Sequence, residues 1–439
     1  MSQKKRLLLV GGLILVLVLA LVAVYFWPKP TPPSPAIDKT VTLHQFEESA
    51  VTSVVLTRTD ATLNFIKTEA GKWHLSGRQE EEVDSAFVFD TVYNAAVLTA
   101  IEKLADSAEN YADYGLDKPA VSVAVYGADG LLSTLHFGHL TLDRSAYYTR
   151  LGDRPEIYLV ATEVVRPFQY TPTQYLHKDV FTLALAEIDS FTMRHPEYGE
   201  VRIVRTADPE DEGLLGSWEM TKPYQKITRA QETEDWLKSI LAIVADDLVE
   251  GTSQAGEYGL TAPAGVVTFT AKDGNVEQAV FSTEHSALRK IGRDRLYLLS
   301  ESSFGFLKTD PFALLEPFLY KVDIATLSTF AWDGHQANLA EGYVVDGKSV
   351  EESAFKNAYL DLMMITILAP AQETDRTALT SEPVFTYSFT EKGGTRHTVK
   401  LYPINAQTCL AEIDGRADFR VDAQKAKTAQ AAFNALLED

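Results

Sequence analysis

The sequence predicts an α+β protein: a single N-terminal transmembrane helix followed by three tandem repeats, each an antiparallel sheet with one helix, the third repeat being degenerate. Three observations support this prediction. A long apolar segment stands near the N-terminus, sequence elements recur about 144 residues apart, and each repeat combines hairpin patterns with one helical pattern. Hairpins joined by tight turns form antiparallel sheets, and a single helix can cover one face of such a sheet.

Residues 7–27 have the length and composition of a transmembrane anchor. Leu7–Phe26 carries no charged residue, and twenty residues at about 1.5 Å each span about 30 Å. Three consecutive basic residues in the tip, residues 1–6, place the N-terminus in the cytoplasm. A cleaved signal peptide is the alternative, because Ala20 and Ala23 fit a small-x-x-small pattern, but its apolar region would be shorter. We therefore expect a single-pass protein of the cell membrane that contacts the lipid bilayer through residues 7–27 and has an extracytoplasmic body.

Residues 28–40 follow as a proline-rich stalk. Five prolines stand between Pro28 and Pro35, and such a segment favours extended polyproline II at about 3.1 Å per residue. The stalk is therefore expected to be semi-rigid and to hold the body a few tens of ångströms from the bilayer.

The charge of the chain excludes several classes of partner. The net charge is −21, and because the first 40 residues carry +4, the remaining 399 carry −25. So acidic a body argues against nucleic acid and against broad docking on anionic lipid. Cys409 is the one cysteine, so the chain has no intramolecular disulfide and no cysteine-based zinc site. Its place in an alternating strand pattern indicates a small buried apolar residue.

Two long stretches of the body repeat one another. Trp73 is matched by Trp218, 145 residues later, and a Tyr-Gly-Leu-x-x-Pro element recurs after 144 residues. A degenerate third copy has Leu379–Pro383 in place of that element. The expected domains are residues 41–185, 186–322 and 323–439. The recurring element comprises Tyr114, Gly115, Leu116 and Pro119 in the first copy and Tyr258, Gly259, Leu260 and Pro263 in the second.

The recurring element has a structural interpretation and a functional one. The glycines suit a left-handed turn, the leucines suit inward anchors, and the prolines bias the chain toward the following strand. We favour this role in packing over the alternative, an exposed recognition loop.

One helix is expected in each copy. The first begins after Asp84 as N-cap and carries Phe87, Val88, Val92, Ala95, Ala96 and Leu104. The second has an apolar stripe of Leu237, Ile240, Leu241, Val244 and Leu248. The third begins at Ser349, which forms a capping box with Glu352, and continues through Phe355, Tyr359 and Met363.

These features together resemble the family of membrane-anchored bacterial proteins described as domain of unknown function 4340. The similarity rests on the N-terminal anchor, Trp73, the first helix, Tyr114–Pro119, Tyr147–Arg150 and Ile157–Val160. The second copy fits with changes, since Thr261 and Ala262 replace the Asp-Lys pair, and the third fits only marginally. The resemblance implies genes beside ABC-2 type transporters and auxiliary proteins of the gliding-motility type. It implies no catalytic residues, because none are established for the family.

Two short segments match the consensus motifs of catalytic sites but are better interpreted as structural segments. Gly342–Ser349 matches a phosphate loop, yet the other copies lack the pattern and a parallel sheet is not expected, so we interpret it as a strand-to-helix turn capped by Ser349. Ser353–Lys356 matches S-x-x-K, as in penicillin-recognising enzymes, but the companion motifs of those enzymes are missing.

Metal ligands are not expected either. His136 and His139 fall on opposite faces of a strand, which makes a shared metal unfavourable. The acidic segment Asp208–Gly213 lacks the alternating spacing of a calcium loop and is interpreted as a solvated hairpin tip. Five further histidines are isolated in sequence and are interpreted as structural or surface residues: His177, His195, His285, His335 and His397.

We therefore expect no catalytic residue, cofactor or metal, and a protein that is not an enzyme. The favoured function is an accessory or binding subunit of a membrane complex, with an ABC-type permease or an auxiliary membrane protein as partner. A stand-alone envelope module that binds glycan or peptide is the alternative, and an envelope hydrolase ranks third.

Overall fold

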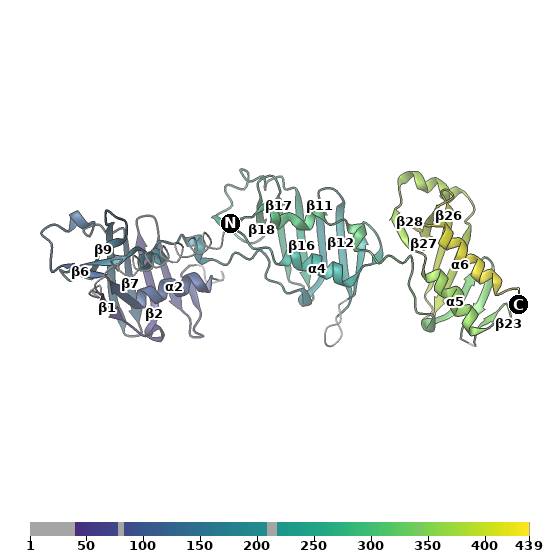
Figure 1. The fold of residues 1–439 in the computed structure, drawn as a ribbon, viewed down its shortest axis with the longest axis horizontal. Helices are drawn as coiled ribbons and strands as arrows, with labels where there is room; N and C mark the ends of the chain where they lie inside the picture. The colour runs from purple at the N-terminus through teal and green to yellow at the C-terminus, as the bar shows by residue number, and fades with distance from the viewer. Residues whose placement is uncertain (1–39, 78–82, 209–216, 341, 439) are drawn as a thin grey trace, which may run out of the picture. The chain divides into compact units, whose positions relative to one another are not determined.

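The computed structural model describes residues 40–77, 83–208, 217–340 and 342–438, and the chain divides into two compact units after Tyr170. The predicted anchor and residues 28–39 of the stalk lie outside the described residues. None of the helices within these ranges has the length and apolar character needed to cross a membrane. The described chain consists of antiparallel sheets and few helices, which confirms the α+β class (Figure 1).

The first unit contains an eight-stranded antiparallel sheet of order β4-β3-β2-β7-β8-β9-β10-β6 and a two-stranded sheet, β1-β5. Its elements are β1 (Val41–Gln45), η1 (Glu48–Ala50), β2 (Val51–Arg58), β3 (Thr62–Lys67), β4 (Trp73–Leu75), α2 (Ser85–Ala96), β5 (Val97–Ala100), β6 (Glu102–Ala105), η2 (Tyr111–Tyr114), β7 (Val121–Gly127), β8 (Gly130–Leu140), β9 (Ala146–Leu151), β10 (Ile157–Ala161), α3 (Thr162–Val165) and η3 (Arg166–Gln169).

The second unit begins with a nine-stranded antiparallel sheet of order β14-β13-β12-β11-β16-β17-β18-β19-β15. The elements of this part are η4 (Pro172–Tyr175), η5 (Leu185–Glu187), β11 (Ile188–His195), β12 (Gly199–Ala207), β13 (Ser217–Lys222), β14 (Lys226–Ile227), α4 (Ala230–Leu241), β15 (Asp247–Glu250), β16 (Gly265–Ala271), β17 (Val276–Ser282), β18 (Ala287–Lys290), β19 (Arg295–Leu298), η6 (Glu301–Lys308) and η7 (Pro311–Leu314).

A further nine-stranded sheet completes the second unit, with order β23-β22-β21-β20-β25-β26-β27-β28-β24. Its elements are η8 (Ile324–Thr326), β20 (Leu327–Trp332), β21 (His335–Asn338), β22 (Val344–Val345), β23 (Lys348–Ser349), α5 (Glu352–Met363), β24 (Ile367–Pro370), η9 (Glu373–Thr380), β25 (Phe385–Glu391), β26 (Arg396–Pro403), β27 (Thr408–Ile413), β28 (Arg416–Asp422) and α6 (Ala423–Ala435).

The three large sheets follow the same path. Each begins with consecutive antiparallel strands, continues through one helix, and then places a crossing strand at the opposite edge of the sheet. This crossing strand, β6, β15 or β24, pairs with the last strand of its own sheet, β10, β19 or β28. The remaining strands of the second half fill the space between. The strands of the three large sheets fall within residues 41–185, 186–322 and 323–439 respectively.

The first two predicted helices end earlier than expected. Asp84 is the N-cap of α2, as predicted, and its carboxylate accepts hydrogen bonds from the amides of Ala86 and Phe87. Leu104, however, lies in β6, and Leu248 lies in β15. Val244 follows α4 and is half exposed. The strand that follows each helix also buries apolar residues. The helix-like spacing of apolar residues therefore continued past the true end of the helix, and the predicted helices were too long.

The prediction for the third helix was wrong at its start. Ser349 does not cap α5; it lies in β23 and pairs with Val344 across a tight hairpin. Asp346 and Gly347 turn this hairpin with positive φ, so the chain must reverse before the helix begins. The expectation of one helix per copy was also incomplete, because β28 continues directly into α6, a helix of 13 residues.

The core of each sheet lies beneath its helix. In β16 the residues alternate strictly between buried and partly buried, as expected for a strand with one covered face. α4 buries Thr233, Trp236, Leu237 and Ile240 on the side that meets the sheet. Figure 1 shows α4 lying across one face of its sheet.

Candidate functional site

The Tyr-Gly-Leu element forms the same turn in both copies. Gly115 has φ of 69° and Gly259 has φ of 67°, a conformation that glycine adopts without strain. Leu116 and Leu260, which follow them, are buried. Pro119 lies two residues before β7, and Pro263 lies two residues before β16.

An imidazole ring packs against each of these glycines. A Cβ atom on Gly115 would lie 2.5 Å from Cδ2 of His139, and one on Gly259 would lie 2.9 Å from Cδ2 of His285. Tyr114 packs edge-on against Tyr148, with ring centroids 5.0 Å apart. The glycines are therefore required by the backbone turn and by close side-chain packing.

The phosphate-loop and S-x-x-K lookalikes do not form shared sites. Lys348 is exposed in the β22-β23 hairpin. Ser353 donates a hydrogen bond to Glu351, whereas Lys356 pairs with Glu352 at 2.5 Å. The serine and the lysine thus have separate partners, Glu351 at the N-cap of α5 and Glu352 in its first turn.

The histidines and the acidic segment have structural surroundings. Nδ1 of His136 lies 2.9 Å from Oγ of Ser122, while His139 packs on the turn at Gly115. Asp208 pairs with Lys272, and this ion pair lowers the pKa of the aspartate; residues 209–213 lie outside the described residues. Within the described ranges no group of three or more His, Cys, Asp and Glu side chains is arranged to hold a metal.

Cys409 is buried in β27, as its pattern predicted. Burial raises the pKa of its thiol, so the reactive thiolate is disfavoured.

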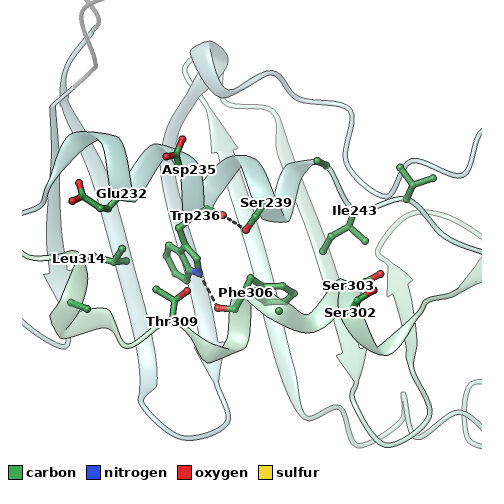
Figure 2. A pocket seen from close by; sticks show the side chains of 14 residues that line it. Glu232, Asp235, Trp236, Ser239, Ile243, Ser302, Ser303, Phe306, Thr309 and Leu314 are labelled. Carbon is green, nitrogen blue, oxygen red and sulfur yellow. Dashed lines mark hydrogen bonds between the residues drawn. The ribbon is translucent and has the colours of Figure 1, made fainter.

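A groove lies along α4 on the helical face of the second sheet (Figure 2). Its volume is about 800 Å³, within the range of small-molecule and cofactor sites. One wall is α4 with the residues just after it, and the other wall is formed by η6 and η7. The lining residues are Glu232, Asp235, Trp236, Ser239, Ala242, Ile243, Val244, Ser302, Ser303, Gly305, Phe306, Thr309, Ala313 and Leu314.

Two hydrogen bonds hold the wall formed by η6 in place. Nε1 of Trp236 donates to the carbonyl of Phe306 at 2.9 Å, across the gap between the walls (Figure 2). Nε2 of His195, at the end of β11, lies 2.9 Å from the carbonyl of Leu307. Nδ1 of this histidine accepts hydrogen bonds from the amides of Glu197 and Tyr198, so Nε2 carries the proton and donates. The width of the groove is thereby fixed by side chains from two different elements.

The groove has an apolar floor and a polar rim. Trp236 and Phe306 form the floor and are each 5% exposed. Because both side chains are almost fully buried and the indole N–H is paired with a carbonyl, they support the groove from beneath and expose only a small apolar area. Glu232 and Asp235 stand on the α4 side of the rim with half-exposed side chains, and serine and threonine hydroxyls stand on the opposite side. Glu232 pairs with Arg229 at 3.5 Å and Asp235 with Lys238 at 4.0 Å, so the charge of these two carboxylates is largely compensated within the chain.

The comparison with known families concerns the middle of the chain. Residues 73–263 match the family model described as Domain of unknown function (DUF4340). This match confirms the resemblance drawn from the sequence. No match to a curated protein or to a solved structure was found.

The DUF4340 match begins and ends at recurring elements. It starts at Trp73, the first residue of β4, and ends at Pro263, the last residue of the second Tyr-Gly-Leu element. It therefore includes α4 but neither β16 nor the wall of the groove formed by η6 and η7.

The groove could not be identified from sequence. Trp236 looks like an ordinary member of an apolar helix face, and Glu301–Leu314 shows neither helical nor strand periodicity. Only the folded chain brings these two segments together. The one signal in the sequence was the cluster of three phenylalanines, Phe304, Phe306 and Phe312, in a segment after the last strand.

Proposed function

We propose that this chain is a membrane-anchored, extracytoplasmic and non-catalytic binding subunit of a membrane complex, such as an ABC-type transporter. The observation that carries the proposal is the groove along α4, with its apolar floor of Trp236 and Phe306 and its acidic and hydroxyl rim. Ligand sites are usually concave and largely preformed, and the groove has this shape.

The sequence supports the location of the protein. Residues 7–27 fit an anchor and residues 28–40 a short stiff stalk, so the body would stay close to the outer loops of a neighbouring membrane protein. Tethering raises the effective concentration of the body at such loops, and a weak interface then suffices. Each of the three copies of this sheet topology also offers a broad sheet surface of its own.

The orientation can be tested with protoplasts. External protease should remove nearly the whole body while leaving residues 1–27 in the membrane. A body that becomes sensitive only after lysis would overturn the N-in topology.

The partner can be tested by co-purification and crosslinking. In mild detergent the full chain should co-purify with a permease. Exchange of Leu7–Phe26 for an unrelated anchor should weaken the complex, and deletion of the body should abolish it. If crosslinking in intact cells captures glycan and no membrane protein, the accessory role fails and the stand-alone binding module replaces it.

A further inference from the structure

A second, smaller pocket lies at the β18-β19 hairpin of the second sheet. Its volume is about 370 Å³, near the lower end of the range of small-molecule sites. Three of its lining residues are basic and one is acidic, although the chain as a whole has a net charge of −21. The lining residues are Thr252, Arg289, Lys290, Ile291, Gly292, Arg293 and Asp294.

Arg289 is a cation of this pocket to which the described chain supplies no acceptor. Its Nε atom is buried and makes no hydrogen bond, and among the described residues no carboxylate forms an ion pair with its guanidinium group. Lys290 differs, because its ammonium group pairs with Glu277 at 2.7 Å. A buried N–H group without an acceptor costs free energy, so such a group marks a position where an anion or a water can bind.

The first copy has an arginine at the same position of its sheet. The strand register relates Arg289, through one residue of β17, to the second residue of β16. Arg150 is related in the same way, through one residue of β8, to the second residue of β7. The Nε atom of Arg150 is also buried without a hydrogen bond. Two copies therefore hold an arginine here with a buried donor that is not used within the described chain.

The other two copies compensate the charge at this position from within the chain. In the third copy the position is Glu412, which pairs with Lys400 of the neighbouring strand at 3.4 Å. In the first copy the guanidinium group of Arg150 lies over the ring of Tyr111, 5.0 Å from its centroid. Arg289 has neither kind of partner among the described residues. In the second copy the position is thus accessible to an anion from outside the chain.

We propose that this pocket binds the phosphate group of a small phosphate ester. The guanidinium group of Arg289 donates to the phosphate oxygens, and the turn of the hairpin donates through its backbone amides. The inference goes beyond the proposed function and does not depend on it, because it concerns a small ligand of the second sheet.

The hairpin turn favours a phosphate over a carboxylate. The amides of Gly292 and Asp294 have no acceptor among the described residues, whereas the two neighbouring amides bond to the carbonyls of Gln278 and Lys290. Gly292 has φ of 86°, and turns of this kind can form concave anion sites from successive amides. A phosphate group offers more acceptor oxygens than a carboxylate, so it can use the guanidinium and the amide donors together.

The size of the pocket limits the rest of the ligand. About 370 Å³ accommodates a phosphate with a small polar group, and none of the lining residues is aromatic, so a nucleobase would have no ring to stack on. Asp294 supplies the one carboxylate of the lining, and this group accepts a hydrogen bond from Oγ1 of Thr252 at 3.2 Å. We therefore expect a glycerol phosphate, either as a free ester or as the headgroup of a phospholipid.

Glycerol 3-phosphate can serve as the probe, with the full chain in detergent as the protein. Binding is measured as broadening of the phosphorus NMR signal of the ester. Inorganic phosphate should compete with the ester, and glycerol should not. No binding of the ester, or equal competition by glycerol and phosphate, overturns the proposal.

Arg289→Gln is the variant that removes the central charge of the site. It should reduce affinity at least tenfold, because the charge-assisted hydrogen bonds are lost while the side chain keeps most of its length. Arg194→Gln is the matched control, since Arg194 is exposed on β11 of the same sheet, three strands or about 14 Å away. The control should leave affinity unchanged, and urea unfolding checks that both variants are folded. Equal affinity in wild type and Arg289→Gln overturns the proposal.

Asp294→Asn should change affinity in the opposite direction. Asparagine can still accept the hydrogen bond from Thr252, so the loop keeps this contact. Loss of the negative charge should strengthen binding of the ester severalfold at low salt, and the gain should shrink at high salt. Unchanged or weaker binding at low salt contradicts a phosphate in this pocket.

A second probe distinguishes the free ester from a phospholipid headgroup. Glycerophosphoglycerol is the deacylated headgroup of phosphatidylglycerol and is a phosphodiester. It should bind at least as tightly as glycerol 3-phosphate if the pocket holds a headgroup, and at least tenfold more weakly if the pocket holds a free monoester. Arg289→Gln should leave co-purification with a permease unchanged, so this inference and the accessory function can fail separately.

Discussion

The imidazole of His139 determines how much stability the protein loses when a side chain is introduced at position 115. Gly115→Ala should destabilise the first unit by about 2–3 kcal/mol, because it adds a methyl group 2.5 Å from the ring to the cost of a positive φ. Gly71→Ala is the control, since Gly71 also has positive φ but has nothing within 4 Å of its Cβ position. Gly71→Ala should lower the free energy of unfolding, measured in urea, by about 1 kcal/mol. Equal losses in the two variants would show that His139 moves aside freely.

Lys226 makes the stability of the second unit depend on pH. Its ammonium group donates to the carbonyls of Phe318 and Leu319, and burial lowers its pKa to about 8 against the opposing effect of Glu316. Between about pH 8 and the ordinary lysine pKa near 10.5 the unfolded chain holds a proton that the folded chain has released. Stability should therefore rise with pH across this window.

The variant Lys226→Met tests this dependence. The variant should lose the rise in urea midpoint between pH 8 and pH 10 that the wild type shows. Lys348→Met, at an exposed lysine, should keep it. A wild-type midpoint that falls over this range would contradict the lowered pKa.

Cys409 and Lys348 should respond differently to substitution. Lys348→Ala changes an exposed side chain and should alter stability by less than about 0.5 kcal/mol, with no effect on any nucleotide binding. Cys409 is 2% exposed, so Cys409→Ser places a hydroxyl in an apolar site and should cost about 1–3 kcal/mol. Urea unfolding of both variants distinguishes these outcomes, and loss of ATP binding in Lys348→Ala would revive the phosphate-loop interpretation.

At the scale of single elements, the caps of the repeat helices make a matched pair. Asp84 accepts two backbone hydrogen bonds at the start of α2, whereas Glu351 makes no side-chain capping bond at the start of α5. Asp84→Ala should therefore destabilise the chain by about 1 kcal/mol and Glu351→Ala by a few tenths. Similar losses in urea unfolding would mean that helix capping is not what distinguishes the two positions.

The elements also show which structural features sequence patterns predict and which they do not. Asp84 was identified correctly because a capping aspartate acts only on the next three residues. Leu248 was wrongly assigned to a helix. It lies in a strand with one covered face, and its burial there fitted the apolar spacing of the preceding helix. Ser349 matched the sequence pattern of a capping box. However, the turn at Gly347 places Ser349 in a hairpin strand, so it does not cap the helix. Local chemistry was therefore predictable, while the ends of the elements depended on tertiary pairing.

At the scale of the whole molecule, the α+β fold class and the internal sequence repeats were predictable because each depends on many residues at once. The agreement of two separate elements at 144 and 145 residues does not depend on any single assignment. The groove was not predictable, because it arises from the distance between α4 and η6, which Trp236 and His195 set across the fold. α6 was missed because its alanines give little contrast between a buried and an exposed face.

The two compact units should unfold separately. Thermal unfolding of the full chain in detergent should show at least two transitions, because the chain divides after Tyr170. Gly115→Ala should lower the midpoint of one transition, and Lys226→Met should shift the midpoint of another. A single transition that both variants shift together would mean that the units unfold cooperatively.

The crossing strands have a consequence for the time at which each sheet can form during synthesis. β15 emerges from the ribosome before β16, but its partner β19 is the last strand of the sheet to be made. A nascent chain that stops at Lys290 therefore holds β15 without its neighbour, and only after Leu298 can that edge be completed. The same delay applies to β6 and β24, so the protein should assemble in three separate steps as translation proceeds.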